Sequence, residues 1–132
     1  DISPEENQFE AGLSFAISKK KNVEFIGKQE LEKIKNEKIV RRFAMFVLKD
    51  SKPGNPLLLH EEPIYLENNI IGRTTSGNYS FNYKKNLSFG YITTELTNKE
   101  LQSKKLYIEV EKHKYEASIL LAPLKNGNFK KA

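Results

Sequence analysis

The 132-residue sequence has no cysteine and only two histidines and two aspartates. Without cysteine, a disulfide framework, a zinc–thiolate site and a thiol nucleophile are excluded, and a reducing compartment is favoured. His60 and His113 are far apart in sequence and have no nearby ligands, so we expect surface histidines and no metal site. Asp1 and Asp50 both lie in predicted loops, which argues against Ser-His-Asp catalysis.

Long apolar segments are also missing, since no run approaches the ~20 residues that cross a bilayer. We therefore expect no membrane partner. The chain opens on Asp1-Ile2-Ser3-Pro4, without an initiator methionine or a signal peptide, so we expect a fragment cut from a longer protein. Its length fits one domain, and 38% apolar residues suffice for a core.

Arginine is scarce as well. The net charge is nevertheless +5, so an anionic partner has to be considered. Lysine supplies 19 of the 22 basic residues, scattered as pairs that are typical of solvated edges and turns. Proteins that read nucleic-acid bases favour arginine on one surface, so we expect no nucleic-acid partner. A stand-alone basic β-barrel that binds RNA or protein is the alternative function, and a capping domain without a ligand is a third.

The apolar pattern predicts mainly β-structure. Leu13–Ile17 alternates and predicts a strand, and Gly27 is the expected N-cap of a short helix from Lys28 to about Asn36, with Ile26 packed on Leu31. Strands are then expected around six segments, which suggests a small closed antiparallel barrel: residues 43–48, 64–66, 70–71, 87–92, 106–110 and 115–121.

No motif in the sequence forms an active site by itself. Gly72 and Gly77 have the spacing of a phosphate-binding loop, but the required lysine does not follow them. We expect a glycine-bounded turn there, in which Thr74-Thr75-Ser76 satisfies backbone groups. Glu61 and Glu62 should point to opposite faces of an extended segment and not form a carboxylate pair.

Three blocks follow one another in a distinctive order: Glu10-Ala11-Gly12-Leu13 before Phe25-Ile26-Gly27-Lys28, Arg41-Arg42 opening a strand, and G-R-T-T-S-G-N-Y-S-F-N-Y-K-K-N-L-S-F-G-Y from Gly72 to Tyr91. Together they resemble the C-terminal barrel of the glycine-cleavage T-protein family, nearest to its dimethylglycine and sarcosine dehydrogenase members. The resemblance implies a six-stranded Greek-key antiparallel barrel at residues 39–132. Residues 1–38 would be a junction segment, one strand plus a short helix, from a preceding folate-binding domain.

The resemblance also implies what the longer protein would do. In such a dehydrogenase FAD oxidises an N-methyl group, and the product passes to tetrahydrofolate to give 5,10-methylenetetrahydrofolate. This segment has no flavin fingerprint, so we expect it to be inactive alone, to bind no FAD and to contain no catalytic residue. It would wall one side of the folate cavity, in the cytoplasm or, in a eukaryote, the mitochondrial matrix.

Three residues are candidates for folate contact on the strength of the resemblance. Phe15 follows Glu-x-Gly-Leu, where the family places an aromatic residue against the folate, although the residues alone favour a half-buried strand aromatic. Lys21 matches a basic position close to that site. Phe129 lies roughly where T-proteins carry a tail tyrosine, but this tail departs from the family pattern.

Overall fold

The computed structural model describes residues 1–17, 24–38 and 40–121. Its strands are β1 (Arg41–Leu48), β2 (Pro63–Leu66), β3 (Asn69–Ser80), β4 (Lys85–Thr93), β5 (Leu106–Val110) and β6 (His113–Leu120). Its helices are α1 (Lys28–Asn36), α2 (Asn98–Ser103) and a 3₁₀ turn at Ser14–Ala16. Within these described ranges, no helix is long and apolar enough to cross a membrane.

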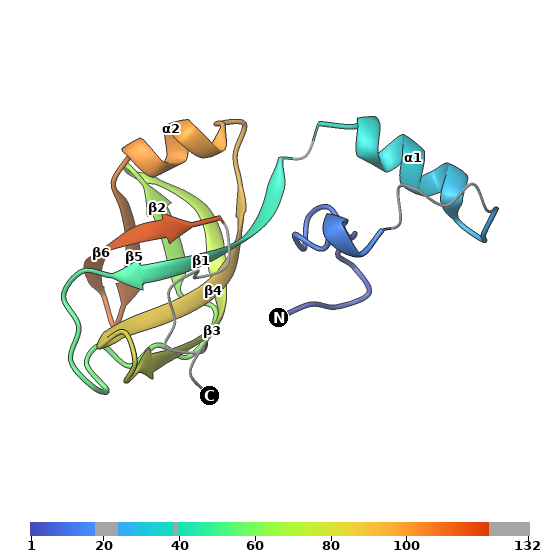
Figure 1. The fold of residues 1–132 in the computed structure, drawn as a ribbon. Helices are drawn as coiled ribbons and strands as arrows, with labels where there is room; N and C mark the ends of the chain where they lie inside the picture. The colour runs from blue at the N-terminus through green and yellow to red at the C-terminus, as the bar shows by residue number, and fades with distance from the viewer. Residues whose placement is uncertain (18–23, 39, 122–132) are drawn as a thin grey trace.

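The six strands close into an antiparallel barrel in the order β1-β4-β3-β2-β5-β6, with β6 paired to β1 (Figure 1). Strands β2, β3 and β4 form a meander, and β1 lies beside β4, which is a Greek-key arrangement. Closure removes the free strand edges that would otherwise invite pairing with other chains. The predicted six-stranded Greek-key barrel is therefore confirmed.

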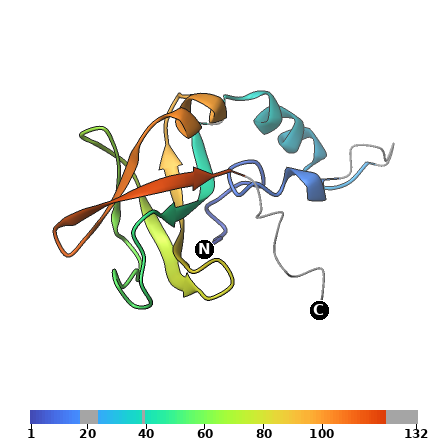
Figure 2. The same ribbon diagram turned by 60° about the vertical axis from the view of Figure 1, so that its left-hand side comes forward.

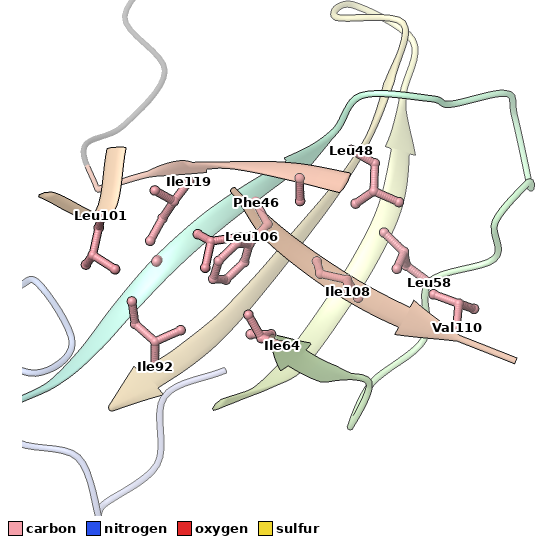
Figure 3. Close-up of a cluster of buried hydrophobic side chains, with 12 residues drawn as sticks. Phe46, Leu48, Leu58, Ile64, Ile92, Leu101, Leu106, Ile108, Val110 and Ile119 are labelled. Atoms are coloured by element: carbon pink, nitrogen blue, oxygen red, sulfur yellow. The ribbon is translucent and has the colours of Figure 1, made fainter. Parts of the chain in front are cut away.

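Large aliphatic side chains from the strands fill the barrel, together with Phe46 at the centre (Figure 3). Those in β1, β5 and β6 come from alternate positions of their strand, as the two-residue repeat of β-structure requires. Burying one such side chain stabilises the fold by about 1.5–3 kcal/mol, so this cluster is a main favourable contribution to folding. Its largest fully buried aliphatic members are Leu48, Ile64, Ile92, Leu101, Leu106 and Ile108.

Helix α2 covers one end of the barrel and places Leu101 in the core (Figures 1 and 3). Thr97 and Glu100 form a reciprocal capping box at its start, in which each side chain accepts a hydrogen bond from the other residue's N–H. This helix was not predicted. The T-x-x-E pattern at Thr97–Glu100 was the signal that could have found it.

The stretch from Gly72 to Gly77 lies inside β3, so the expected turn is wrong. A Cβ at Gly72 would lie 1.9 Å from the Tyr91 carbonyl oxygen, and one at Gly77 would lie 2.4 Å from the Leu58 Cβ. These glycines are therefore required by the close approach of neighbouring chain segments rather than by an unusual backbone conformation.

The residues before the barrel contain one confirmed element and one that is wrong. Helix α1 begins and ends as predicted after Gly27, which has φ 87°. The predicted strand at Leu13–Ile17 is instead a 3₁₀ turn at Ser14–Ala16. The closed barrel leaves no free edge with which a seventh strand could pair, so this segment has no partner for extended structure.

The predicted packing at the start of α1 is also absent. Ile26 is fully exposed and does not pack on Leu31. Leu31 and Ile34 are only half-buried, so the apolar face of this helix is as narrow as the sequence suggests. Figures 1 and 2 show α1 beside the barrel, on the side where residues 1–17 lie.

Candidate functional site

An apolar groove of about 320 Å³ lies between the outer wall of the barrel and residues 1–17, which we call the strap. The barrel side is formed by β1, β4 and the end of β6, and the strap forms the opposite rim. The lining side chains come from both parts: Ala11, Leu13 and Phe15 from the strap, and Phe43, Met45, Phe89, Leu120 and Leu121 from the barrel and the residue after it.

Aromatic rings form the wall of this groove. Phe43 and Phe89 are stacked, with ring centroids 5.3 Å apart and planes 7° from parallel. The Tyr91 ring, which does not itself line the groove, lies behind this pair with its centroid 5.2 Å from that of Phe43. All three side chains point outward because the alternating residues of β1 and β4 fill the barrel. A concave surface lined by apolar and aromatic side chains is the kind that binds flat ligands or another protein surface.

The strap is fastened to the barrel next to the groove. The Phe43 N–H donates to the Glu10 carbonyl oxygen at 2.8 Å, and the Arg41 guanidinium contacts the carboxylates of Glu6 and Glu10. Within the strap, the Asn7 side chain accepts hydrogen bonds from two backbone N–H groups, which fixes its turn. Because of these contacts, the strap rim of the groove has a defined position.

Phe15, the first candidate residue, lines the groove and is 82% exposed. The half-buried strand aromatic that the residues alone favoured is therefore wrong: Phe15 lies in the 3₁₀ turn with its ring toward solvent. Lys21 and Phe129, the other two candidates, lie outside the described residues. A role in folate contact stays a prediction for all three.

Sequence reasoning missed Phe43 and Phe89 as groove residues. Their separation in sequence hides their proximity, which arises because β1 pairs with β4 and places Met45 opposite Phe89. One signal was available: the segment from Phe43 to Leu48 is apolar at every position, so both of its faces had to be covered.

Other residues that the sequence singled out do not form a site. Glu61 is exposed and Glu62 is buried, so the two carboxylates lie in different surroundings, although Glu61 has φ 63° and the expected extended backbone is wrong there. His60 and His113 are both exposed, as predicted. In the part of the chain that the structure describes, no group of three or more His, Asp or Glu residues could hold a metal ion.

Residues 41–125 match the family profile described as the glycine cleavage T-protein C-terminal barrel domain. The chain is 33% identical over 127 residues to the mitochondrial dimethylglycine dehydrogenase of Mus musculus, which covers 94% of this chain but 14% of that protein. The human protein of the same name gives the same identity and coverage. An aminomethyltransferase of Synechococcus elongatus is 24% identical over 97% of this chain and 32% of its own length.

The fold is shared with a solved structure. The crystal structure of glycine cleavage system aminomethyltransferase T from Bartonella henselae covers 90% of this chain, with a TM-score of 0.70 at 19% identity, and 32% of that chain is matched. The present chain thus spans a small part of the relatives that it matches. By its sequence profile and its closed barrel, it belongs to the glycine-cleavage T-protein family, as a C-terminal barrel domain.

Proposed function

We propose that this chain is the C-terminal domain of a tetrahydrofolate-dependent aminomethyltransferase module within a flavin-dependent dimethylglycine or sarcosine dehydrogenase. Its role is to wall one side of the folate cavity and to stabilise the enzyme. FAD belongs to another part of that protein. The partner of this domain is a preceding folate-binding domain, to which the junction segment, residues 1–38, belongs.

The observation that carries this proposal is the apolar groove with Phe15 at its rim. Phe15 is exposed and lines the same groove as the stacked pair of Phe43 and Phe89. The flat rings of a folate fit such a surface, because aromatic rings stack favourably and the groove is lined by apolar side chains. The chemistry that tetrahydrofolate supplies in such a module is acceptance of the one-carbon unit.

The contribution of this chain's own residues is binding and orientation. Phe15 offers a ring face to the ligand, and Phe43 with Phe89 excludes water from one side of the groove. Among the described residues that line the groove, no pair of side chains combines an acid with a base, so these residues are not suited to proton transfer.

Phe15→Ala in the intact protein that carries this chain tests the proposal. An aromatic stacking contact is worth on the order of 1 kcal/mol beyond its buried area, so tetrahydrofolate affinity should fall several-fold. Phe81→Ala is the matched control, because Phe81 is similarly exposed at 78% but does not line the groove. Isothermal titration measures both variants. Unchanged affinity in a correctly folded Phe15→Ala protein would refute a folate contact.

A further inference from the structure

Arg41, at the start of β1, joins the strap to the barrel through three contacts. Its Nη2 donates to the Glu6 Oε1 at 2.9 Å, and its Nη1 lies 3.8 Å from the Glu10 Oε2. Its guanidinium carbon lies 4.3 Å from the centroid of the Tyr91 ring. Both carboxylates belong to the strap and the ring belongs to β4, so a single side chain bridges two parts of the fold.

The Glu6 carboxylate of this ion pair is largely covered and is held in place by further hydrogen bonds. The Glu6 side chain is 7% exposed and also accepts hydrogen bonds from the hydroxyl and the backbone N–H of Ser3, at 2.6 and 2.7 Å. A carboxylate this covered is screened little by salt, and losing its cation would leave a buried charge without its partner. Glu6 therefore ties the strap to Arg41 more firmly than an exposed pair would.

Residues next to these contacts line the groove. The Glu10 carbonyl accepts the Phe43 N–H, and Ala11 and Leu13, which follow Glu10, line the groove rim. On the barrel side, the ring under Arg41 packs against Phe43. The guanidinium thus contacts the strap and β4 through residues that are direct neighbours of groove-lining residues.

Arg42, the next residue along β1, contacts a different part of the fold and serves as a comparison for Arg41. The Arg42 side chain donates to the Thr94 carbonyl oxygen at 3.4 Å, and also to the Leu96 carbonyl oxygen and the Asn98 side chain, all in or before α2. Successive residues of a strand face opposite sides, so one arginine holds the strap and the next holds the α2 segment.

We propose that Arg41 is a positioning residue that fastens the strap to the barrel and thereby fixes the groove rim that carries Phe15. For the folate contact of that rim, this inference rests on the proposed function. The fastening itself is a property of this chain and can be measured without a ligand. Arg41 acts through the strap and the Tyr91 ring rather than through the ligand.

Amide hydrogen exchange on the purified chain, followed residue by residue by NMR, tests the fastening. In Arg41→Met, exchange at the N–H groups of Leu13 and Phe43 should become about tenfold faster or more, which corresponds to the loss of one charge-assisted hydrogen bond. Exchange of the paired amides in β5 and β6 should stay unchanged. Arg42→Met is the control: it should accelerate exchange in α2 and leave the strap unaffected.

A second variant keeps the test decisive if Arg41→Met disturbs the barrel. Glu6→Gln removes the partner charge from the strap and leaves every barrel strand intact, and it should accelerate the same strap amides. The double variant should add little to Arg41→Met alone, because Arg41→Met already removes the ion pair with Glu6. Unchanged exchange of the strap in Glu6→Gln and Arg41→Met, or equal acceleration throughout the barrel in both, would overturn the proposal.

Folate affinity of the intact protein separates this inference from the proposed function. If both hold, Arg41→Met weakens tetrahydrofolate binding in the same direction as Phe15→Ala. If the strap amides exchange faster in Arg41→Met but neither variant changes folate affinity, the fastening by Arg41 stands and the folate contact of the rim fails. If Phe15→Ala weakens binding while the strap amides of Arg41→Met stay protected, the positioning role of Arg41 fails.

Discussion

Thr74 and Thr75, adjacent on β3, place their hydroxyl groups in different surroundings. The Thr74 hydroxyl is buried, accepts the Glu62 N–H at 2.9 Å and donates to the Glu62 carboxylate. The other oxygen of that carboxylate accepts the Leu59 N–H at 2.7 Å, which holds the loop that enters β2. Within the described structure, the buried Thr75 hydroxyl has no hydrogen-bond partner.

Replacing each threonine by valine separates these two situations. Thr74→Val should lower the free energy of unfolding by about 1–3 kcal/mol, because it leaves buried groups of Glu62 without their partner. Thr75→Val should be neutral or stabilising, because it removes a buried hydroxyl that gains nothing in return. Urea unfolding followed by circular dichroism measures both. Equal losses in the two variants would contradict the assigned roles.

The contribution of the Glu6 carboxylate to the stability of the folded state depends on pH. The hydrogen bonds from the Ser3 hydroxyl and N–H, followed by the Arg41 guanidinium, lower the pKa of Glu6 from 4.5 to about 2. A carboxyl group with a lowered pKa in the folded state stabilises it above pH 4.5, and this contribution is lost as the pH falls from 4.5 toward 2.

The difference in unfolding free energy between the wild-type chain and Glu6→Gln should therefore be largest near neutral pH and shrink below about pH 4.5. Urea titrations at a series of pH values measure it, and taking the difference removes the shared effect of the other carboxylates. A difference that stays constant from pH 7 to pH 3 would show that Glu6 titrates normally in the folded protein.

Helix α2 illustrates how local sequence signals act on a whole element. It has only six residues, too few to be stable alone, so it depends on its cap and on burial of Leu101. The reciprocal bonds between Thr97 and Glu100 satisfy N–H groups that the first helical turn cannot satisfy itself.

Thr97→Ala should lower the free energy of unfolding by about 1 kcal/mol, since it removes the accepting side chain at the N-cap. Gln102→Ala lies on the same helix at an exposed position and should change stability by less than about 0.5 kcal/mol. Thermal and urea unfolding compare the two. A loss for Gln102→Ala as large as that for Thr97→Ala would rule out the cap as the cause.

At the level of the whole molecule, the charge of +5 comes from lysines that are scattered along the sequence. Several lysines are paired with glutamates on different parts of the surface, among them Lys38 with Glu95, Lys49 with Glu116 and Lys104 with Glu67. Paired and scattered charges create a weaker field toward a polyanion than a single basic face would.

We therefore expect no sub-micromolar binding to generic RNA or DNA at about 150 mM salt, because non-specific binding depends on many simultaneous phosphate contacts. A gel-shift titration over a range of salt concentrations measures this. Tight binding that is lost when Lys84 and Lys85, or Lys104 and Lys105, are neutralised would replace the folate-enzyme proposal by the basic binding module.

Much of the barrel could be predicted from sequence because its signals are local. The two-residue alternation in β5 correctly predicts that Leu106, Ile108 and Val110 are buried. Helix α1, which follows Gly27, is also predicted correctly. The candidate site was predictable only at Phe15, and there only through the resemblance to a family. The aromatic wall depends on strand pairing between residues about 45 positions apart, which no local pattern reports.

The sequence by itself determined the strand alternation, the start of α1 and the family, since these depend on neighbouring residues and motif order. Tertiary structure decided which face of each strand is the core. On β4 the inner face carries the small Ser88 and Gly90 before Ile92, while the larger Phe89 points outward. The physical reason is closure: the interior of a six-stranded barrel already holds Phe46 and its aliphatic neighbours, so the rings of β4 lie outside.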